Sequence, residues 1–294
     1  MDIQLTGEAD QMMSLSEIRY GKSRVRVARV KRTAERHEFR EWTLDVMLQG
    51  DFDASFTQGD NSKVLPTDTM KNTVYSLAQN SSAECMEEFA KELIDFFLGR
   101  NTHVSKAEVS VTEKHWENLL TGDGRPHPTT FVQSTSESQS TKVSRTREGE
   151  FSIVSGLENL IIMKTAGSAF EGYIHDSLTT LPETADRLLS TAVRATWTCT
   201  KAELPFHKLR TKIRAILLAT FADHDSKSVQ HTLYAMGEAV LKNVSEIDDI
   251  HLIMPNRHYN LVDLSKFGQH NPNEIFVPVD EPHGNIQARI RRQG

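Results

Sequence analysis

The sequence predicts an α+β protein built from two tandem copies of one unit, in which an antiparallel sheet carries a helix pair on one face. Each half opens with two segments whose apolar residues alternate, continues with two amphipathic helices, and returns to alternating segments. The second helix recurs 144 residues later, at 84–99 and again at 228–243. The pattern leaves one alternative open, a single irregular domain of similar elements.

Length and composition agree with this class. The chain has 294 residues, and a typical domain has roughly 150. Apolar residues make up 38% and charged residues 25%, as in globular proteins. The net charge of −6, without a long basic segment, predicts no nucleic-acid partner. Apolar runs such as 160–163 are far shorter than the roughly 20 residues that span a bilayer, so we expect no membrane partner.

The cysteines and the chain ends favour a cytoplasmic location. Cys85 and Cys199 lie far apart without a CxxC motif, which predicts two buried thiols in a reducing compartment. Residues 1–10 lack the pattern of a secretory signal. The last residues do not form the peroxisomal address Ser-Lys-Leu, so a peroxisomal location would require a longer natural C-terminus.

In the first half, strands are expected at 24–30, 42–48 and 107–111, and helices from residue 67 to 75 and over 84–99. A further strand is expected at 129–134. The polar stretch 134–141 is read as a hairpin loop or a linker. We place the boundary near Arg147, which gives units of 1–147 and 148–294.

In the second half, strands are expected at 151–164, 192–201 and 250–254. Pro205 suits the first turn of a helix, and Ser228 suits the N-cap of the next.

Common cofactor and hydrolase motifs are absent, including G-x-G-x-x-G, the P-loop, H-E-x-x-H and G-x-S-x-G. His224 and His231 flank a helix break, but no further ligands with zinc-site spacing accompany them, which favours surface histidines. An enzyme of this sequence is therefore expected to work without a metal, flavin or nicotinamide.

Several short segments carry polar residues that folding alone does not require. Taken singly, Lys22 reads as a solvated residue near a strand start, Thr67 as a helix N-cap, and His258 as a surface residue at a strand end. Taken together, these segments occur in one order along nearly the whole chain. They are 20–23 (YGKS), 59–62 (GDNS), 67–75 (TDTMKNTVY), 155–157 (SGL), 164–170 (KTAGSAF), 179–187 (TTLPETADR), 228–236 (SVQHTLYAM), 255–258 (PNRH) and 271–276 (NPNEIF).

In these segments the chain resembles the urate oxidase (uricase) family. The resemblance implies the tunnelling fold, with two units per chain and four chains closing a tunnel as a homotetramer whose active sites lie at subunit interfaces. It also implies cofactor-free oxidation of urate by dioxygen and water to 5-hydroxyisourate and hydrogen peroxide, with no metal.

By this resemblance, Arg187 and Gln230 hold the polar edge of urate, Phe170 stacks on its ring, and Leu181 and Val229 line the pocket. Urate is a flat anion with carbonyl oxygens and ring nitrogens along its edge. The forked N–H donors of an arginine, a side-chain amide and an aromatic ring therefore suit urate chemically.

The resemblance also assigns the proton chemistry. Lys22 and Thr67 act together as the general base, in which the lysine activates the threonine hydroxyl, a poor base alone. His258 extends the proton relay, and Asn256 with Thr67 holds dioxygen and then water above the ring. Thr67 and Asp68 are expected to come from a neighbouring subunit.

The chain departs from the usual family residues at four positions beside the site, Ala166, Leu178, Arg257 and Asn260. Two other functions remain open from the sequence. One is a non-catalytic purine-binding protein that retains the pocket, and the other is an enzyme of the same fold that acts on pterins.

Overall fold

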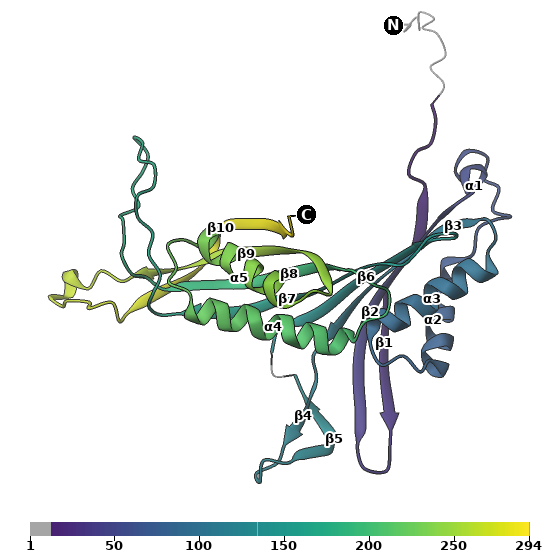
Figure 1. Ribbon diagram of the computed structural model, residues 1–294, viewed down its shortest axis with the longest axis horizontal. Helices are drawn as coiled ribbons and strands as arrows, with labels where there is room; N and C mark the ends of the chain where they lie inside the picture. Colours follow the sequence, from purple (N-terminus) through teal and green to yellow (C-terminus); the bar gives the residue numbers. More distant parts are fainter. Residues whose placement is uncertain (1–12, 134, 294) are drawn as a thin grey trace, which may run out of the picture.

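The computed structural model describes residues 13–133 and 135–293. In that part of the chain, eight strands form one sheet in which all neighbours are antiparallel (Figure 1). In spatial order they are β1 (Arg19–Arg32), β2 (His37–Gly50), β3 (Val104–Lys114), β6 (Ser138–Thr146), β7 (Ser152–Lys164), β8 (Leu189–Cys199), β9 (Ile247–Leu261) and β10 (Phe276–Arg291). Strands β4 (Glu117–Leu120) and β5 (Pro126–Val132) pair with each other outside this sheet.

The strand register places buried residues opposite one another on neighbouring strands, so that they form one face across the sheet. Residues directly opposite each other share a face because side chains alternate along each strand. The buried residues that lie opposite one another are Val46, Val109, Val143 and Ile153, then Ser155, Trp197 and Ile250. One side of the sheet is therefore buried continuously, and it is apolar except for a polar cluster near its centre.

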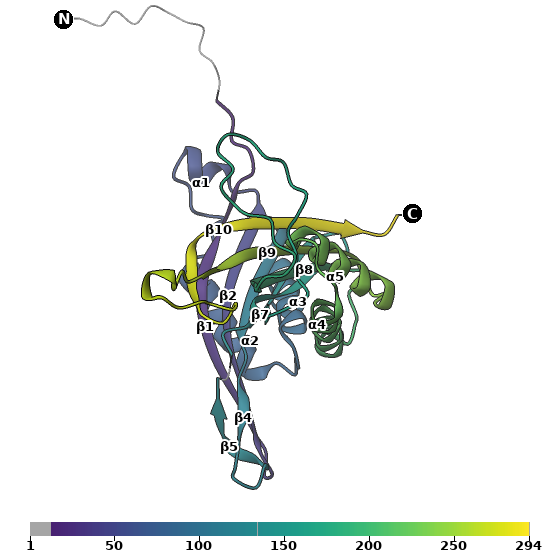
Figure 2. The same cartoon turned by 90° about the vertical axis from the view of Figure 1, so that its left-hand side faces the viewer.

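Two helix pairs cover this side, and the helices of both halves lie to the same side of the sheet (Figure 2). Helices α2 (Thr67–Asn80) and α3 (Met86–Arg100) pack on β1, β3 and β6. Helices α4 (Phe206–Asp223) and α5 (Val229–Asn243) pack on β7, β9 and β10. Trp42 stacks on Phe89 with ring centroids 5.2 Å apart, so β2 and α3 share the core. Short helices α1 (Asp53–Thr57) and η1 (Ser265–Phe267) lie in loops.

Each half thus runs strand, strand, helix pair, strand, strand, and the predicted fold class is confirmed. The two halves also end alike. Arg147, directly after β6, donates to the carbonyls of Leu98 and Asn101 at the end of α3. Arg292, directly after β10, donates to the carbonyls of Leu241 and Val244 at the end of α5. In both halves an arginine after the last strand satisfies helix carbonyls that have no partner within the helix.

The expectation for the polar stretch is wrong. Residues 138–141 begin β6, a central strand of the sheet, and the predicted strand at 129–134 corresponds to β5 in the separate hairpin. Residue 134 lies outside the described residues. Thr141 is buried and only 3% exposed, and its hydroxyl lies 3.3 Å from that of Ser155 on β7. Hydroxyl side chains can occupy a buried strand when a neighbouring strand supplies their partners.

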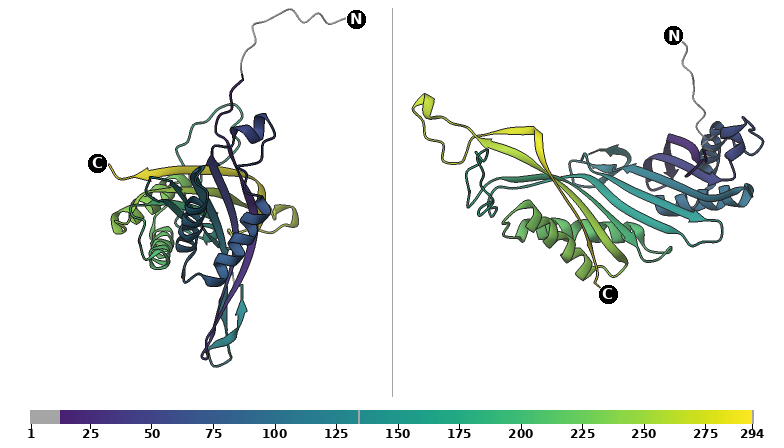
Figure 3. Two further views of the ribbon diagram at one scale, coloured as in Figure 1. Left: turned by 90° about the vertical axis from the view of Figure 1, so that its right-hand side faces the viewer. Right: turned by 90° about the horizontal axis from the view of Figure 1, so that it is seen from above.

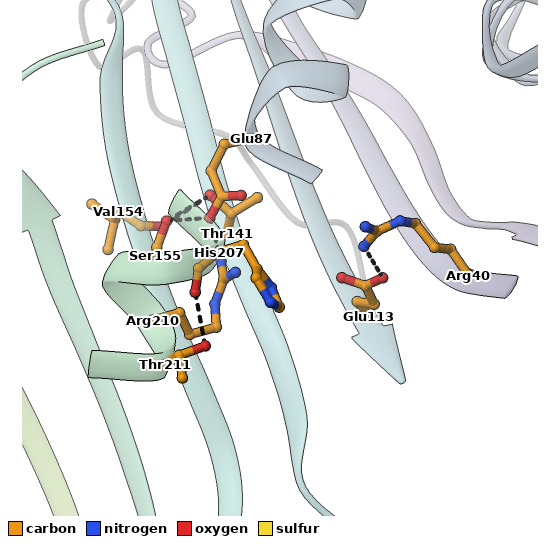
Figure 4. Close-up of polar contacts among 9 residues, drawn as sticks. All are labelled: Arg40, Glu87, Glu113, Thr141, Val154, Ser155, His207, Arg210 and Thr211. Carbon is orange, nitrogen blue, oxygen red and sulfur yellow. Dashed lines mark hydrogen bonds and ion pairs between the residues drawn. The ribbon is translucent and has the colours of Figure 1, made fainter. Parts of the chain in front are cut away.

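A buried polar cluster joins the two halves at the centre of the sheet (Figure 4). Glu87 of α3 is fully buried and forms an ion pair with Arg210 of α4, which is 3% exposed. Ser155 of β7 donates to the same carboxylate oxygen at 2.6 Å. The sheet continues from β6 to β7 across the predicted boundary, so the division at 147/148 remains a prediction.

The expected buried thiols are confirmed. Cys85 and Cys199 are both free and buried, and burial raises the pKa of each thiol to about 12. Ser228 caps α5 as expected, accepting from the backbone N–H of His231 at 3.1 Å. Thr67 is not an N-cap, because Pro66 holds that position before α2. Within the described residues, no helix is long and apolar enough to cross a membrane.

Candidate active site

A cavity of about 450 Å³ lies between the loop 165–188 and the adjoining ends of β9 and β10. This loop and the turn after β9 both lie at the left of Figure 1. Five of the predicted site residues line the cavity: Phe170, Leu181, Arg187, Asn256 and His258.

Backbone bonds fix the loop at Phe170 and Arg187. The Phe170 N–H donates to Thr184 at 2.8 Å and the Thr184 N–H returns a bond at 3.1 Å, while the Arg187 N–H donates to Ser168 at 2.7 Å. The Arg187 guanidinium carbon lies 5.1 Å from the centroid of the Phe170 ring. A cation above an aromatic face is an attractive arrangement. The cavity therefore has an aromatic wall and a cation beside it.

The Arg187 guanidinium is partly desolvated. Burial lowers its pKa from the usual value for arginine, although the group remains charged. Among the described residues, none accepts a hydrogen bond from its buried Nε atom. A buried donor without an acceptor is costly, and a ligand with acceptors along one edge would relieve that cost.

Strand β9 supplies another part of the wall. Asn256 and His258 are half-buried and two residues apart, so their side chains share a face of the strand. Between their pairing partners Gly284 and Val279 on β10, the register shifts, as at a β-bulge. Bulges next to sites re-aim side chains.

The start of α5 lies next to the cavity loop. Ser226 pairs with Ser168 in an isolated bridge, and the Ala169 N–H donates to Ser226 at 2.7 Å. Gln230 is exposed in the first turn of α5, whereas Val229 is 2% exposed and belongs to the hydrophobic core. Neither residue lines the cavity of the single chain.

The other three predicted residues form a second group in the first half. The Tyr20 hydroxyl accepts from the Leu65 N–H at 2.8 Å and donates to the Leu65 carbonyl at 3.2 Å, which fixes β1 against the start of α2. Lys22 and Thr67 each follow this contact by two residues. Asp68 bonds to Lys71 at 2.5 Å; this contact lowers the pKa of Asp68, and the charge of Lys22 adds to the shift.

The backbone around Lys22 is irregular. The register between β1 and β2 shifts between Lys22 and Val25, with Arg24 in the left-handed region at φ 58°. The Arg24 N–H donates to the Asp45 carboxylate at 2.6 Å instead of continuing the ladder. Gly21 has no room for a side chain, because a Cβ would lie 1.8 Å from the Val46 carbonyl oxygen.

The two groups do not meet within one chain. Lys22 lies on β1 and His258 on β9, which are six strand positions apart in the sheet. At the usual strand spacing this separation is about 29 Å along the sheet. Figure 3 shows the turn after β9 and helices α1 and α2 at opposite ends of the molecule. A single copy therefore holds the predicted site residues in two separate groups.

The cavity also contains residues to which the sequence analysis gave no role. They include Thr165, Glu183, Tyr259, Asn273 and Phe276. All but Tyr259 lie within the short segments that carry the resemblance, so these segments could have pointed to them as site residues. His224 and His231 do lie together, with ring centroids 4.3 Å apart. Among the described residues, no group of three His, Cys, Asp or Glu side chains is placed to hold a metal ion.

These features define a class: a tandem-repeat α+β protein with an antiparallel sheet and a cavity lined by an arginine and an aromatic ring. The Uricase family model matches residues 18–144 and 153–287. The chain belongs to the uricase family.

Individual relatives agree over nearly the full length. A uricase of Arthrobacter globiformis is 39% identical over 280 residues, which cover 95% of this chain and 90% of that protein. A uricase of Dictyostelium discoideum is 38% identical over 283 residues, covering 96% and 98%. The crystal structure of uricase from Arthrobacter globiformis matches with a TM-score of 0.91 at 38% identity, covering 97% of this chain and 96% of that one.

Proposed function

We propose that this protein is a urate oxidase that converts urate, dioxygen and water to 5-hydroxyisourate and hydrogen peroxide. The observation that carries the proposal is the shared cavity of Phe170, Arg187, Asn256 and His258 in a chain of the uricase family. The reaction balances, because urate gives up two electrons and dioxygen accepts them to become peroxide. Water supplies the new hydroxyl group.

Substrate binding follows from the chemistry of the cavity walls. The Phe170 ring supplies a platform for the flat purine. Arg187 supplies charge-assisted donors to the anionic edge, and its buried Nε atom is available for a bond. Gln230, at the start of α5 beside the loop, adds an amide that donates and accepts. Leu181 adds an apolar part of the wall, whereas the Val229 side chain is buried in the core of the single chain and does not line the cavity.

Proton handling is the protein's contribution to the chemistry. Removing a proton makes bound urate a better electron donor towards dioxygen. We assign the base to Lys22 with Thr67, whose hydroxyl needs an adjacent base to act. His258 carries protons onward, and Asn256 with Thr67 positions dioxygen and then water. These steps use no metal and no organic cofactor.

The working site is composed of two copies. The half-site with Lys22, Thr67 and Asp68 of one subunit meets the cavity of another, because one chain holds them six strand positions apart. A homotetramer with interface sites fits this requirement, and an isolated chain would be inactive. We further place the protein in the cytoplasm, which the two free buried thiols support.

The test is an assay with purified protein after exhaustive chelation and dialysis. The ultraviolet absorbance of urate should fall, with one hydrogen peroxide formed for each urate consumed. A flat trace from an assembled oligomer would contradict the proposal. In that case calorimetry with urate would identify a purine-binding protein without turnover, and a pterin turnover assay would test the remaining alternative.

A further inference from the structure

Tyr173, outside the cavity, stacks on the ring that forms its aromatic wall. The ring centroids of Phe170 and Tyr173 are 4.7 Å apart and the ring planes differ by 16°. Phe170 lines the cavity and Tyr173 does not. Tyr173 therefore supports the Phe170 ring from outside the space that a ligand would fill.

The Tyr173 hydroxyl reaches a second part of the same wall. It donates to the Leu181 carbonyl at 2.5 Å, and Leu181 also lines the cavity. Partial desolvation, with the charge of Glu183, raises the pKa of the Tyr173 hydroxyl, which keeps its proton available for this bond. One side chain thus ties together two wall residues that lie 11 positions apart in the sequence.

The local backbone is built for this contact. Gly172 has φ 69°, in the left-handed region that favours glycine, and the chain bends at this residue, two positions after Phe170. The Gly172 N–H donates to the Glu183 carboxylate at 3.0 Å. On the far side of Tyr173, His175 stacks at 4.8 Å, and its Nε2 atom lies 3.4 Å from the same carboxylate.

Backbone bonds alone do not orient the Phe170 ring. The bonds to Thr184 fix the main chain, but the two side-chain torsions remain free to choose among rotamers. Neighbouring groups must select one, and Tyr173 covers a ring face with a nearly parallel ring. The platform for a planar ligand is therefore a stacked pair.

We propose that Tyr173 is a positioning residue for the purine substrate, which sets the orientation of Phe170 and the place of Leu181 without touching urate. This inference rests on the proposed function. It predicts that Tyr173 controls substrate affinity through its ring and has little influence on the chemical step.

The test compares Tyr173→Leu and Tyr173→Met with Tyr173→Phe. Loss of one aromatic pair should raise the urate KM, and the dissociation constant of urate measured without oxygen, about 3- to 10-fold. The value of kcat should change little. Tyr173→Phe retains the ring and should restore most of the affinity. Because Tyr173 is only partly buried and lies outside the hydrophobic core, all three variants are expected to fold.

Ile174→Ala is the matched control, since this neighbour in the same loop is 92% exposed. Its KM should equal that of the unchanged protein, with the same elution volume and melting temperature for all variants. An unchanged KM in Tyr173→Leu and Tyr173→Met would overturn the inference, as would a loss confined to kcat. If the unchanged protein does not oxidise urate, the proposed function fails instead. Anaerobic binding of urate then still tests the role of Tyr173.

Discussion

The guanidinium carbon of Arg187 lies 5.1 Å from the centroid of the Phe170 ring, and both residues line one cavity. Seventeen positions separate them in the sequence. Backbone bonds to Thr184 and Ser168 bring the two ends of the loop together. A charged fork and an aromatic platform at this spacing can grip a planar anion by its edge and its face together.

Replacing Arg187 by alanine should weaken urate binding about 10- to 100-fold, because it removes charge-assisted hydrogen bonds. The measurement is the dissociation constant of urate without oxygen, together with KM. Arg187→Lys should recover only part of the affinity, since lysine keeps the positive charge but lacks the forked N–H donors of the guanidinium group. Arg194→Ala, which removes an exposed arginine on β8, is the control and should bind normally. Equal affinities for all three variants would reject the role of Arg187.

Lys22→Met should reduce kcat by roughly 100-fold or more, the usual contribution of general acid–base catalysis, while anaerobic urate binding changes little. Steady-state kinetics and calorimetry on one preparation separate the two effects. Lys31→Met changes an exposed lysine on the same strand and should leave both parameters as they were. Normal turnover with collapsed binding in Lys22→Met would show that the base lies elsewhere.

Mixing two inactive variants should restore activity if the site is shared between copies. A chain with Lys22→Met retains an intact cavity, and a chain with Arg187→Ala retains an intact Lys22 group. If co-expression mixes the two variant chains at random and in equal amounts, about a quarter of the sites would combine an intact cavity with an intact Lys22 group. Activity should therefore return to about a quarter of the unchanged level per site. No recovery in a proven mixed oligomer would place the whole site within one chain.

Glu87→Gln should lower the free energy of unfolding by about 3–5 kcal/mol, because it leaves Arg210 buried without its counter-charge. Urea denaturation of the oligomer at fixed protein concentration measures the change. Glu238→Gln is the control, since Glu238 pairs with Lys242 at 2.9 Å on the exposed face of α5. Its effect should stay within about 0.5 kcal/mol. Similar losses in both variants would argue against a stabilising role for the buried pair.

Stability should fall as the pH drops below about 6.5, the usual pKa of histidine. Burial lowers the pKa of His224, with further contributions from His231 and Lys164, while Asp225 opposes the shift. A histidine with a depressed pKa stabilises the fold above its unfolded pKa, and that contribution is lost as the pH falls through the folded value.

Melting temperatures from pH 7.5 to 5 should therefore fall less steeply for His224→Gln than for the unchanged protein. Part of the slope should remain, because burial also lowers the pKa of His251. His270→Gln, a change at an exposed histidine, is the control. Identical slopes in all three proteins would exclude His224 as a source of acid sensitivity.

Elements with a strong period were predictable from the chain alone. Alternation at Trp42, Leu44 and Val46 marks β2, and the spacing of Phe89 and Leu93 marks α3, because in each case one face is buried. Strand β6 was missed because Thr141 is polar, and only its neighbours on β3 and β7 make its burial tolerable. Its exclusion from the sheet was the main error of the sequence reading.

The candidate site divides in the same way. Residue types that suit urate and dioxygen chemistry can be recognised in short segments such as 67–75 and 255–258, where folding alone does not require hydroxyls, amides and imidazoles. The sequence does not show which of these residues lie together in space, because that depends on contacts between distant segments. Ser168 meets Ser226 across the cavity loop, whereas Lys22 and His258 end six strand positions apart.

Local periodicity thus indicated the repeat architecture, because burial on one face leaves a regular pattern along the chain, and the ordered short segments carried the resemblance to the family. The stack of Tyr173 on Phe170, the buried pair that links the two halves and the separation of Lys22 from His258 required the folded chain. The reason is physical. Each of these features depends on which segments, distant in the sequence, lie next to one another, and no pattern within a single segment shows this.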